Sequence, residues 1–209
     1  TIISNLGVLL RVKGDHQWRA QAAQRLADHA AAEPLLREAL EVRRETLGSR
    51  HQSTLDSIGS LGSLFYSKGD LLAAEPLYRE ALEGERETLG NRHSSTLNSI
   101  HNFGMLQQAK GDLAAAEPLY REALDGQRET LGNRFPHTIT SMRNLGVLLR
   151  DKGDLTAAEP LLREALEVLQ ETLGSRHPRT RSLVIALEVL EATQSLKLLM
   201  AKVDLAAAP

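Results

Sequence analysis

The side chains of this sequence best suited to acid–base chemistry or metal binding are its seven histidines. Three of them, His51, His93 and His177, occupy the same loop position of an internal repeat. Equivalent positions in stacked helix pairs lie on the order of 20 Å apart, so these three side chains cannot ligate one metal ion. We therefore interpret them as structural residues of the loops.

No recognisable motif for catalysis or phosphate binding is present. The sequence has no cysteine, which excludes a cysteine nucleophile, a disulfide framework and a thiolate zinc site. It contains no Gly-x-Gly-x-x-Gly loop, no Walker-type Gly-Lys-Ser/Thr and no His-Glu-x-x-His. We expect no enzymatic activity, and we assign no catalytic, metal-binding or cofactor-binding residue.

Overall charge and hydropathy exclude two further classes of partner. The formal net charge is -2, and nucleic acid or an acidic membrane would require a clustered positive face. The longest apolar run, from Leu196 to Ala201, is interrupted by Lys197 and is too short to span a bilayer. We expect a cytoplasmic protein that binds neither nucleic acid nor membranes. Because the sequence starts at Thr1 without a targeting signal, we also expect it to be part of a longer chain.

A repeat of 42 residues organises the sequence. Its markers are the Glu-Pro pairs that begin at Glu33, Glu75, Glu117 and Glu159, and the glycines Gly48, Gly90, Gly132 and Gly174. A fixed period in this range is the signature of a repeat architecture. We divide one solenoid over residues 1–209 into 1–52, with an insertion at about 16–28, then 53–94, 95–136, 137–178, and a capping or degenerate repeat over 179–209.

Each repeat has the pattern of two amphipathic helices. In the second repeat, apolar residues recur at i, i+3, i+4 and i+7 from Leu55 to Phe65 and again from Leu71 to Leu89. Lys68-Gly69-Asp70 predicts the turn between them, since Gly69 can end one helix in the left-handed conformation and Asp70 can cap the next. The pairs Glu33–Arg37, Glu75–Arg79, Glu117–Arg121 and Glu159–Arg163 are spaced i,i+4, which indicates a solvated outer face.

Small and apolar residues at fixed places give the sequence a family resemblance. Leu61-Gly62, Ala74, Tyr78 and Ala81 match the tetratricopeptide pattern, in which small residues let the two helices pack closely. The segments Ala116 to Leu124, Glu129 to Gly132 and Asn144 to Gly146 resemble the kinesin light chain-like subtype, with its 42-residue repeat. The resemblance implies an all-α, right-handed superhelical solenoid of antiparallel helix pairs.

The same resemblance implies a peptide-binding groove lined by the first helices. In that family an Asn just before the Leu-Gly pair contacts the backbone of a bound extended peptide. The matching positions here are Asn5, Asn102 and Asn144, whereas Ser60 and Ala186 depart from the pattern. Ser60 can still make one hydrogen bond and Ala186 none, so we expect the grip on a peptide to weaken toward the C-terminus.

Comparison of the second and third repeats independently favours a groove. Residues 68–93 and 110–135 are identical at 22 of 26 positions, whereas residues 54–67 and 96–109 match at only 6 of 14. The differing pairs include Gly59/His101, Ser60/Asn102, Ser63/Met105 and Tyr66/Gln108. Most lie opposite the apolar stripe, where a solenoid presents its concave surface. The alternative is drift on an exposed face.

Charge along the predicted groove suggests the class of partner. We expect His101, Arg143 and Arg150 to project from first helices near the groove, with Arg11 further along. Their positive bias suits an acidic extended peptide or a C-terminal segment, although isolated surface arginines are also common. The predicted peptide-binding residues are therefore Asn5, Ser60, His101, Asn102, Met105, Arg143, Asn144 and Arg150.

The two ends depart from the regular repeat. The insertion at about 16–28 holds Trp18, and we expect it to extend the second helix of the first repeat or to add a turn beside it, either as a tolerated insertion or as a partner-specific element. Residues 179–201 read as another first helix, and residues 202–207 echo the Lys-Gly-Asp turn, displaced by eight residues. Exposed apolar residues there, including Val189, Leu196, Leu199 and Met200, imply a missing neighbour or a self-association surface.

Taken together, these patterns predict a protein–protein interaction scaffold, an adaptor module that binds peptide segments of partner proteins in its concave groove. The alternative is a sensor or autoinhibitory repeat array within a larger nucleotide-hydrolysing signalling protein, because this repeat type also occurs beside nucleotide-binding domains. A phosphate-binding loop upstream in the full chain would favour that alternative.

Overall fold

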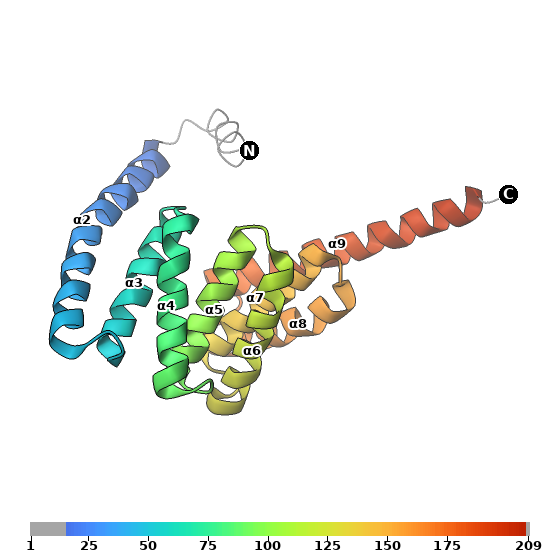
Figure 1. The fold of residues 1–209 in the computed structure, drawn as a ribbon. Helices are drawn as coiled ribbons and strands as arrows, with labels where there is room; N and C mark the ends of the chain where they lie inside the picture. The colour runs from blue at the N-terminus through green and yellow to red at the C-terminus, as the bar shows by residue number, and fades with distance from the viewer. Residues whose placement is uncertain (1–15, 208–209) are drawn as a thin grey trace.

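The computed structural model describes the backbone of residues 16–207 and the side chains of residues 31–200. Over that range the chain forms eight helices and no strand (Figure 1). The helices are α2 (His16–Leu47), α3 (Gln52–Ser67), α4 (Leu71–Leu89), α5 (Ser94–Ala109), α6 (Leu113–Leu131), α7 (Pro136–Lys152), α8 (Leu155–Leu173) and α9 (Pro178–Ala207). The predicted all-α repeat fold of antiparallel helix pairs is confirmed.

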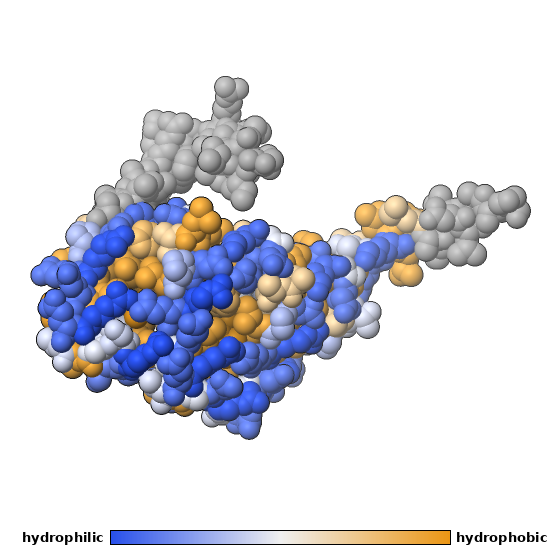
Figure 2. All heavy atoms as spheres, in the orientation of Figure 1, coloured by the Kyte–Doolittle hydropathy of each residue, from blue (hydrophilic) through white to orange (hydrophobic). Residues whose placement is uncertain are grey.

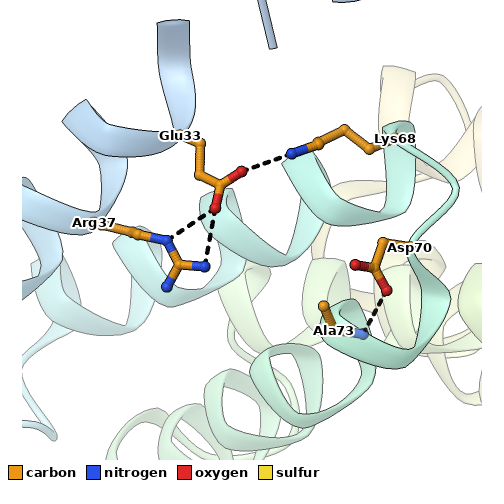
Figure 3. A network of polar contacts seen from close by, with 5 residues as sticks. All are labelled: Glu33, Arg37, Lys68, Asp70 and Ala73. Atoms are coloured by element: carbon orange, nitrogen blue, oxygen red, sulfur yellow. Dashed lines mark hydrogen bonds and ion pairs between the residues drawn. The ribbon is translucent and has the colours of Figure 1, made fainter. Parts of the chain in front are cut away.

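The turn within each pair forms as the Lys-Gly-Asp sequence predicts. Gly69 has φ = 79°, a left-handed value that favours glycine, and the backbone N–H of Ala73 donates to the Asp70 carboxylate over 3.1 Å (Figure 3). Asp112 and Asp154 cap α6 and α8 in the same way. One three-residue motif therefore ends a first helix and starts a second helix in three consecutive pairs.

The loop histidines begin the first helices. Nδ1 of His51 accepts a hydrogen bond from the Ser53 N–H over 3.2 Å, and His93 and His177 do the same at the start of α5 and α9. The interpretation of these histidines as structural is confirmed. At the start of α7, Phe135 makes no such bond, and Pro136 at the first helical position needs no partner for a backbone N–H.

Close approach of the two helices in a pair depends on glycine. A methyl group added at Gly62 of α3 would lie 2.9 Å from Cδ1 of Tyr78 on α4, and one at Gly146 of α7 would lie 2.7 Å from Cδ2 of Leu162 on α8. Both distances are too short for carbon atoms, so the aromatic or leucine side chain packs directly on the glycine backbone. The close packing expected from the tetratricopeptide pattern is present.

The helices form two layers. The first helices contact one another in succession, α3 with α5, α5 with α7, and α7 with α9. Among the described residues, the backbones of the second helices α4, α6 and α8 make no such direct contact with each other. The first helices therefore form the tighter, inner layer of the curved stack, and the second helices spread over its outer surface.

Repeating ion pairs link neighbouring pairs of helices. Glu33 of α2 bonds both Arg37, one turn further along α2, and Lys68 at the end of α3 (Figure 3). The same arrangement recurs at Glu75 with Arg79 and Lys110. The outer layer is bridged by Arg44–Glu80, Arg86–Glu122 and Arg128–Glu164. The predicted i,i+4 pairs are thus confirmed, and the glutamates Glu33 and Glu75 also form ion pairs with a lysine of the next repeat.

The two terminal helices are longer than the others. Residues 16–28 extend α2, the second helix of the first repeat, as one of the two expected outcomes. The turn that residues 202–207 echo does not form, because α9 continues without a break to Ala207 (Figure 1). At residue 203 a valine stands where such a turn requires glycine, so the similarity to the motif does not end the helix. Apolar atoms gather on the projecting part of α9 (Figure 2).

Candidate functional site

A cavity of about 250 Å³ lies on the inner layer, where three successive first helices meet. It is lined by Tyr66 of α3, Met105, Gln108 and Ala109 of α5, Arg143, Asn144 and Val147 of α7, and by Tyr120 of α6. The structure therefore brings together three of the predicted site residues, Met105, Arg143 and Asn144. Three consecutive helix pairs contribute to one hollow.

Asn144 is held in place by a histidine of the preceding pair. Its amide nitrogen lies 3.1 Å from Nε2 of His101, and Nδ1 of His101 lies 2.9 Å from Oγ of Ser141. An amide nitrogen can only donate, so Nε2 accepts and the proton of the neutral ring is on Nδ1, which donates to Ser141. This network joins α5 to α7 directly below the cavity.

His101 is buried, with 7% of its surface exposed. The expectation that it projects from α5 near the groove was wrong, because the ring turns toward Ser141 and Asn144 of α7. Its centroid lies 5.3 Å from that of the Tyr120 ring. Burial lowers the pKa of His101 from 6.5 to about 4, and the nearby His137 and Arg143 add to the effect. The imidazole is therefore neutral at physiological pH, as its hydrogen bonds require.

Other polar groups near the cavity belong to the scaffold. The phenol of Tyr120, fully buried, donates to Oε1 of Gln108 over 2.8 Å, and burial raises the pKa of this tyrosine far above its usual range. In the preceding pair Tyr78 donates to Oγ of Ser63 over 3.1 Å. Such phenols stay protonated, so they orient neighbouring side chains and do not act as bases.

The remaining predicted residues differ in how free they are to bind a ligand. Asn102 is half-buried on α5, and its side chain makes no hydrogen bond to any described residue. Ser60 is exposed, but its hydroxyl donates to the Asp56 carbonyl of its own helix over 2.8 Å. Asn5 and Arg11 lie outside the described residues. Of the predicted residues that the structure describes, Asn102 and Asn144 are the two with side-chain amides, and they lie on adjacent first helices.

The two predicted arginines have different partners. Arg150 is paired with Asp151 over 2.7 Å, which neutralises its charge locally. Arg143 lines the cavity, is half-buried, and forms no ion pair with a described residue. The positive bias expected of the groove therefore comes from Arg143 in the part of the chain that the structure describes.

A wider hollow of about 660 Å³ lies on the outer layer, between Ser49, Arg50 and the exposed face of α4. Both of its arginines are already paired, Arg79 with Glu75 and Arg50 with Glu87. No group of three potential ligands among the described residues could hold a metal ion. No described helix is both long and apolar enough to cross a membrane.

Sequence reasoning missed several residues of the cavity. Tyr66 and Gln108 are equivalent residues of the second and third repeats, and they form one of the pairs that differ between those repeats. The sequence difference at this position could therefore have identified them. Tyr120 carried no such signal, because its motif marks it as a core residue. The outer ion pairs between repeats were also missed, although the 35-residue and 36-residue spacings of Lys68–Glu33 and Arg44–Glu80 could have revealed them.

Comparison with known proteins places this geometry in context. Residues 16–196 match the model of the MalT-like TPR region. The solved structure of BtubC (BKLC) from P. vanneervenii is 25% identical, with a TM-score of 0.72, over 84% of this chain and 70% of that chain. The Q17M crystal structure of a putative kinesin light chain of Podosopora anserina, with nearly identical TPR-like repeats, is also 25% identical. Its TM-score is 0.69, over 88% of this chain and 89% of that chain. Among curated proteins, none matches this sequence.

Proposed function

Because the chain belongs to the family of MalT-like tetratricopeptide repeat regions, we propose that it is a non-catalytic scaffold that holds an extended peptide of a partner protein against its first helices. The tetratricopeptide resemblance, with kinesin light chain-like repeats, is confirmed by this match and by the structural neighbours. Tetratricopeptide repeats generally serve protein interactions through such curved surfaces. The observation that carries the proposal is Asn144, fixed by His101 at the edge of the shared cavity.

The spacing of the two amide side chains suits an extended peptide. Asn102 and Asn144 lie on α5 and α7, and packed helices are about 10 Å apart. An extended chain rises about 3.3 Å per residue, so the two side chains would contact backbone groups about three residues apart. Asn144 uses one N–H on His101, and its carbonyl oxygen and second N–H have no partner among the described residues. These two groups of Asn144 are one acceptor and one donor, and they match the N–H and the carbonyl oxygen of a peptide backbone.

Charge favours an acidic segment as the partner. Arg143 precedes Asn144 on α7, lines the same cavity and forms no ion pair with a described residue. A carboxylate beside the bound backbone would give this guanidinium a partner, and hydrogen bonds between charged groups are stronger than neutral ones. The proposed ligand is therefore an extended peptide with at least one acidic side chain near the residues that Asn102 and Asn144 contact.

A fluorescence-polarisation screen with a library of ten-residue acidic peptides tests the proposal. Replacing Asn102 and Asn144 together by Ala should weaken binding about tenfold or more, because at least two hydrogen bonds are lost. Asn91→Ala is the matched control, since Asn91 is exposed in a loop and its side chain makes no hydrogen bond to a described residue. Equal loss in the control and the double variant, or no binding at all, would reject the groove.

The family match also supports the second candidate function, a sensor or autoinhibitory array in a larger nucleotide-hydrolysing protein. In that case the groove would bind a segment of the same full-length chain. A nucleotide-binding domain encoded beside this segment, and faster nucleotide hydrolysis after its deletion, would distinguish this candidate from an adaptor.

We also propose that α9 is a surface for self-association. Exposed apolar residues follow one stripe of this helix at alternating spacings of four and three, through Ile185, Val189, Ala192, Leu196 and Leu199. These spacings are typical of the seam of a two-helix coiled coil, and an identical helix of a second copy would be complementary to it. A cytoplasmic location stays an expectation from the sequence.

A further inference from the structure

A second cavity, of about 390 Å³, lies beside the groove between the first half of α7, the end of α8 and the start of α9. Its lining residues are Arg134, Pro136, Ile139, Thr140, Arg143, Leu169, Thr172, Leu173 and Arg179. Cavities of this size hold small ligands or single anchoring side chains. Asn102 and Asn144, the proposed contacts of the peptide backbone, do not line this cavity.

The floor of this cavity is apolar. Ile139 and Leu169 are buried at its floor, and Leu173 is 45% exposed at its edge. An apolar side chain that entered would be stabilised there, because its surface would be removed from water. The occupant therefore carries a large apolar group.

Three guanidinium groups surround the same space. Arg134 is paired with Glu171, whereas Arg143 and Arg179 form no ion pair with a described residue. Two unpaired cations beside an apolar floor favour a ligand that joins an anion to an apolar group. A phosphate group alone would leave the floor empty, and an uncharged apolar group would leave the arginines without a partner.

The corresponding positions in the preceding repeats lack this combination. Where Leu169 stands, the second and third repeats have Glu85 and Gln127, both buried. Where Arg143 stands, the third repeat has His101, which is also buried and bonded to α7. A carboxylate such as Glu85 at the floor would repel an anionic ligand. The apolar floor and the free guanidinium groups therefore occur together in the fourth repeat.

Arg143 lines both the groove cavity and this second cavity, so the two are adjacent along α7. A peptide that passes Asn144 reaches the second cavity with its next residues. We infer that the second cavity binds the C-terminal residue of a partner chain, its free carboxylate on Arg143 and Arg179 and its large apolar side chain against Ile139 and Leu169. The inference deepens the proposed function, and it rests on the groove only for the path of the preceding residues.

The test uses ten-residue peptides from the groove screen that end in Leu, each made as the free acid and as the C-terminal amide. We expect the acid to bind about tenfold more tightly than the amide, and Arg179→Gln to remove this difference. Arg92→Gln is the matched control, because Arg92 is the counterpart of Arg134 one repeat earlier and pairs with Glu129. Leu169→Gln, which installs the residue of the third repeat, should also weaken binding of the acid while the helical circular dichroism is retained.

A second probe separates this inference from the proposed function. N-acetyl-Leu-Leu as the free acid is too short to contact both Asn102 and Asn144, and it should shift the side-chain N–H resonances of Arg143 and Arg179 where its amide does not. If binding of the longer peptides depends on Asn144 but acid and amide bind equally, the result supports the groove and rejects the carboxylate site in the second cavity. If octanoate binds as tightly as the peptide acid and Asn144→Ala has no effect on either, the site takes small carboxylates and the assignment to a partner chain is overturned.

Discussion

Asn144 of α7 donates a hydrogen bond to Nε2 of His101 on α5 over 3.1 Å, so a buried ring of one helix pair orients a polar group of the next. The ring is fixed from its other side by Ser141, also on α7. His101 stands where the second repeat has Gly59 and the fourth has Arg143, which means that this contact is specific to one junction of the solenoid. The groove therefore has one amide that is preorganised and one, on Asn102, that is not.

Replacing His101 by Phe should weaken peptide binding about fivefold, because the apolar ring keeps the packing but removes the acceptor that orients Asn144. The measurement is fluorescence polarisation with wild-type protein, His101→Phe, Asn144→Ala and the double variant. If His101 acts through Asn144, the first substitution adds nothing in the Asn144→Ala background. An equal further loss in that background would show that His101 acts by some other route.

Acid should destabilise the wild-type protein through His101. Its pKa is lowered from 6.5 to about 4 in the folded chain, so the unfolded state binds a proton first. The stability contributed by the neutral ring is fully present above the ordinary pKa of histidine. It is lost as the pH falls from there toward the pKa of His101 in the folded chain. By about pH 4.5 the loss reaches about 2 to 3 kcal/mol.

Urea unfolding at about pH 7.5 and about pH 4.5 checks this prediction. His101→Gln is the reference variant, because it retains polar atoms for Ser141 and Asn144 but does not titrate. The carboxylates titrate in both proteins and cancel in the comparison. The same pH dependence in both proteins would mean that His101 does not change its protonation over this range.

Much of the fold follows from the sequence, because the signals are local and repeated. Gly69 and Asp70 specify a turn within three residues, and the pattern recurs at Gly111 and Gly153, where φ is again positive. Residues 202–204 resemble the motif but form no turn for the same local reason, since Val203 disfavours the left-handed conformation that glycine supplies. Elements set by short-range chemistry were predictable from the residues alone.

The site was less predictable, because it depends on contacts between repeats. Variation between the second and third repeats marked Met105, the family resemblance marked Asn144, and charge marked Arg143. The structure places all three at one cavity of the inner layer. Whether a variable side chain faces the groove or the next helix depends on helix rotation, which a periodic pattern does not determine to within one residue. His101 is therefore buried and orients Asn144, which lies 43 residues further on in the next repeat.

Glu85→Gln should stabilise the protein at neutral pH. Glu85 is buried with 3% exposure, and its Oε2 has no hydrogen-bond partner among the described residues. Burial raises its pKa, a hydrogen bond from Ser99 opposes the shift, and the charge of Asp56 adds to it. The folded state thus favours the protonated carboxyl, and this contribution to stability is lost as pH rises through the folded pKa.

The gain for Glu85→Gln should be on the order of 1 kcal/mol near neutral pH and should vanish below the ordinary pKa of a glutamic acid. Gln127 occupies the same position one repeat later, so the amide is known to fit the surrounding helices. Thermal unfolding of Glu85→Gln and Glu83→Gln, the latter exposed on the same helix, provides the comparison. A gain that stays constant with pH would exclude the buried charge as its cause.

The ion pairs between repeats should contribute little individually. Glu75 bonds Lys110 over 2.6 Å and Arg79 over 3.0 Å, and these contacts lower its pKa, the bond from Lys110 most of all. Because the pairs are solvent-exposed, Glu75→Gln should cost at most about 1 kcal/mol. This stability is present above the ordinary pKa of a glutamate and lost as pH falls below it.

High salt distinguishes the contribution of the Glu75 ion pairs to stability from the contribution of helix packing. In roughly 1 M NaCl the difference between wild-type protein and Glu75→Gln should disappear, since exposed charges are screened over about 3 Å. Gly62→Ala, which forces a methyl group against Tyr78, should cost about 1 to 3 kcal/mol at any salt concentration. If Glu75→Gln cost as much as Gly62→Ala and kept that cost in high salt, the ion pairs would be structural supports of the repeat stack.

The apolar stripe of α9 should pair two copies of the chain. Leu196 lies on the stripe with 57% of its surface exposed, and Leu198, 65% exposed, lies on the opposite side of the same helix. Sedimentation velocity from micromolar to millimolar protein should show a reversible dimer for the wild-type chain. Leu196→Glu should abolish the dimer, because it places a charge at the centre of the seam, and Leu198→Glu should leave it unchanged. A monomer at every concentration, or the same response to both substitutions, would refute pairing along this stripe. The two leucines are similarly exposed and only two residues apart, so only a contact confined to one face of α9 would distinguish them.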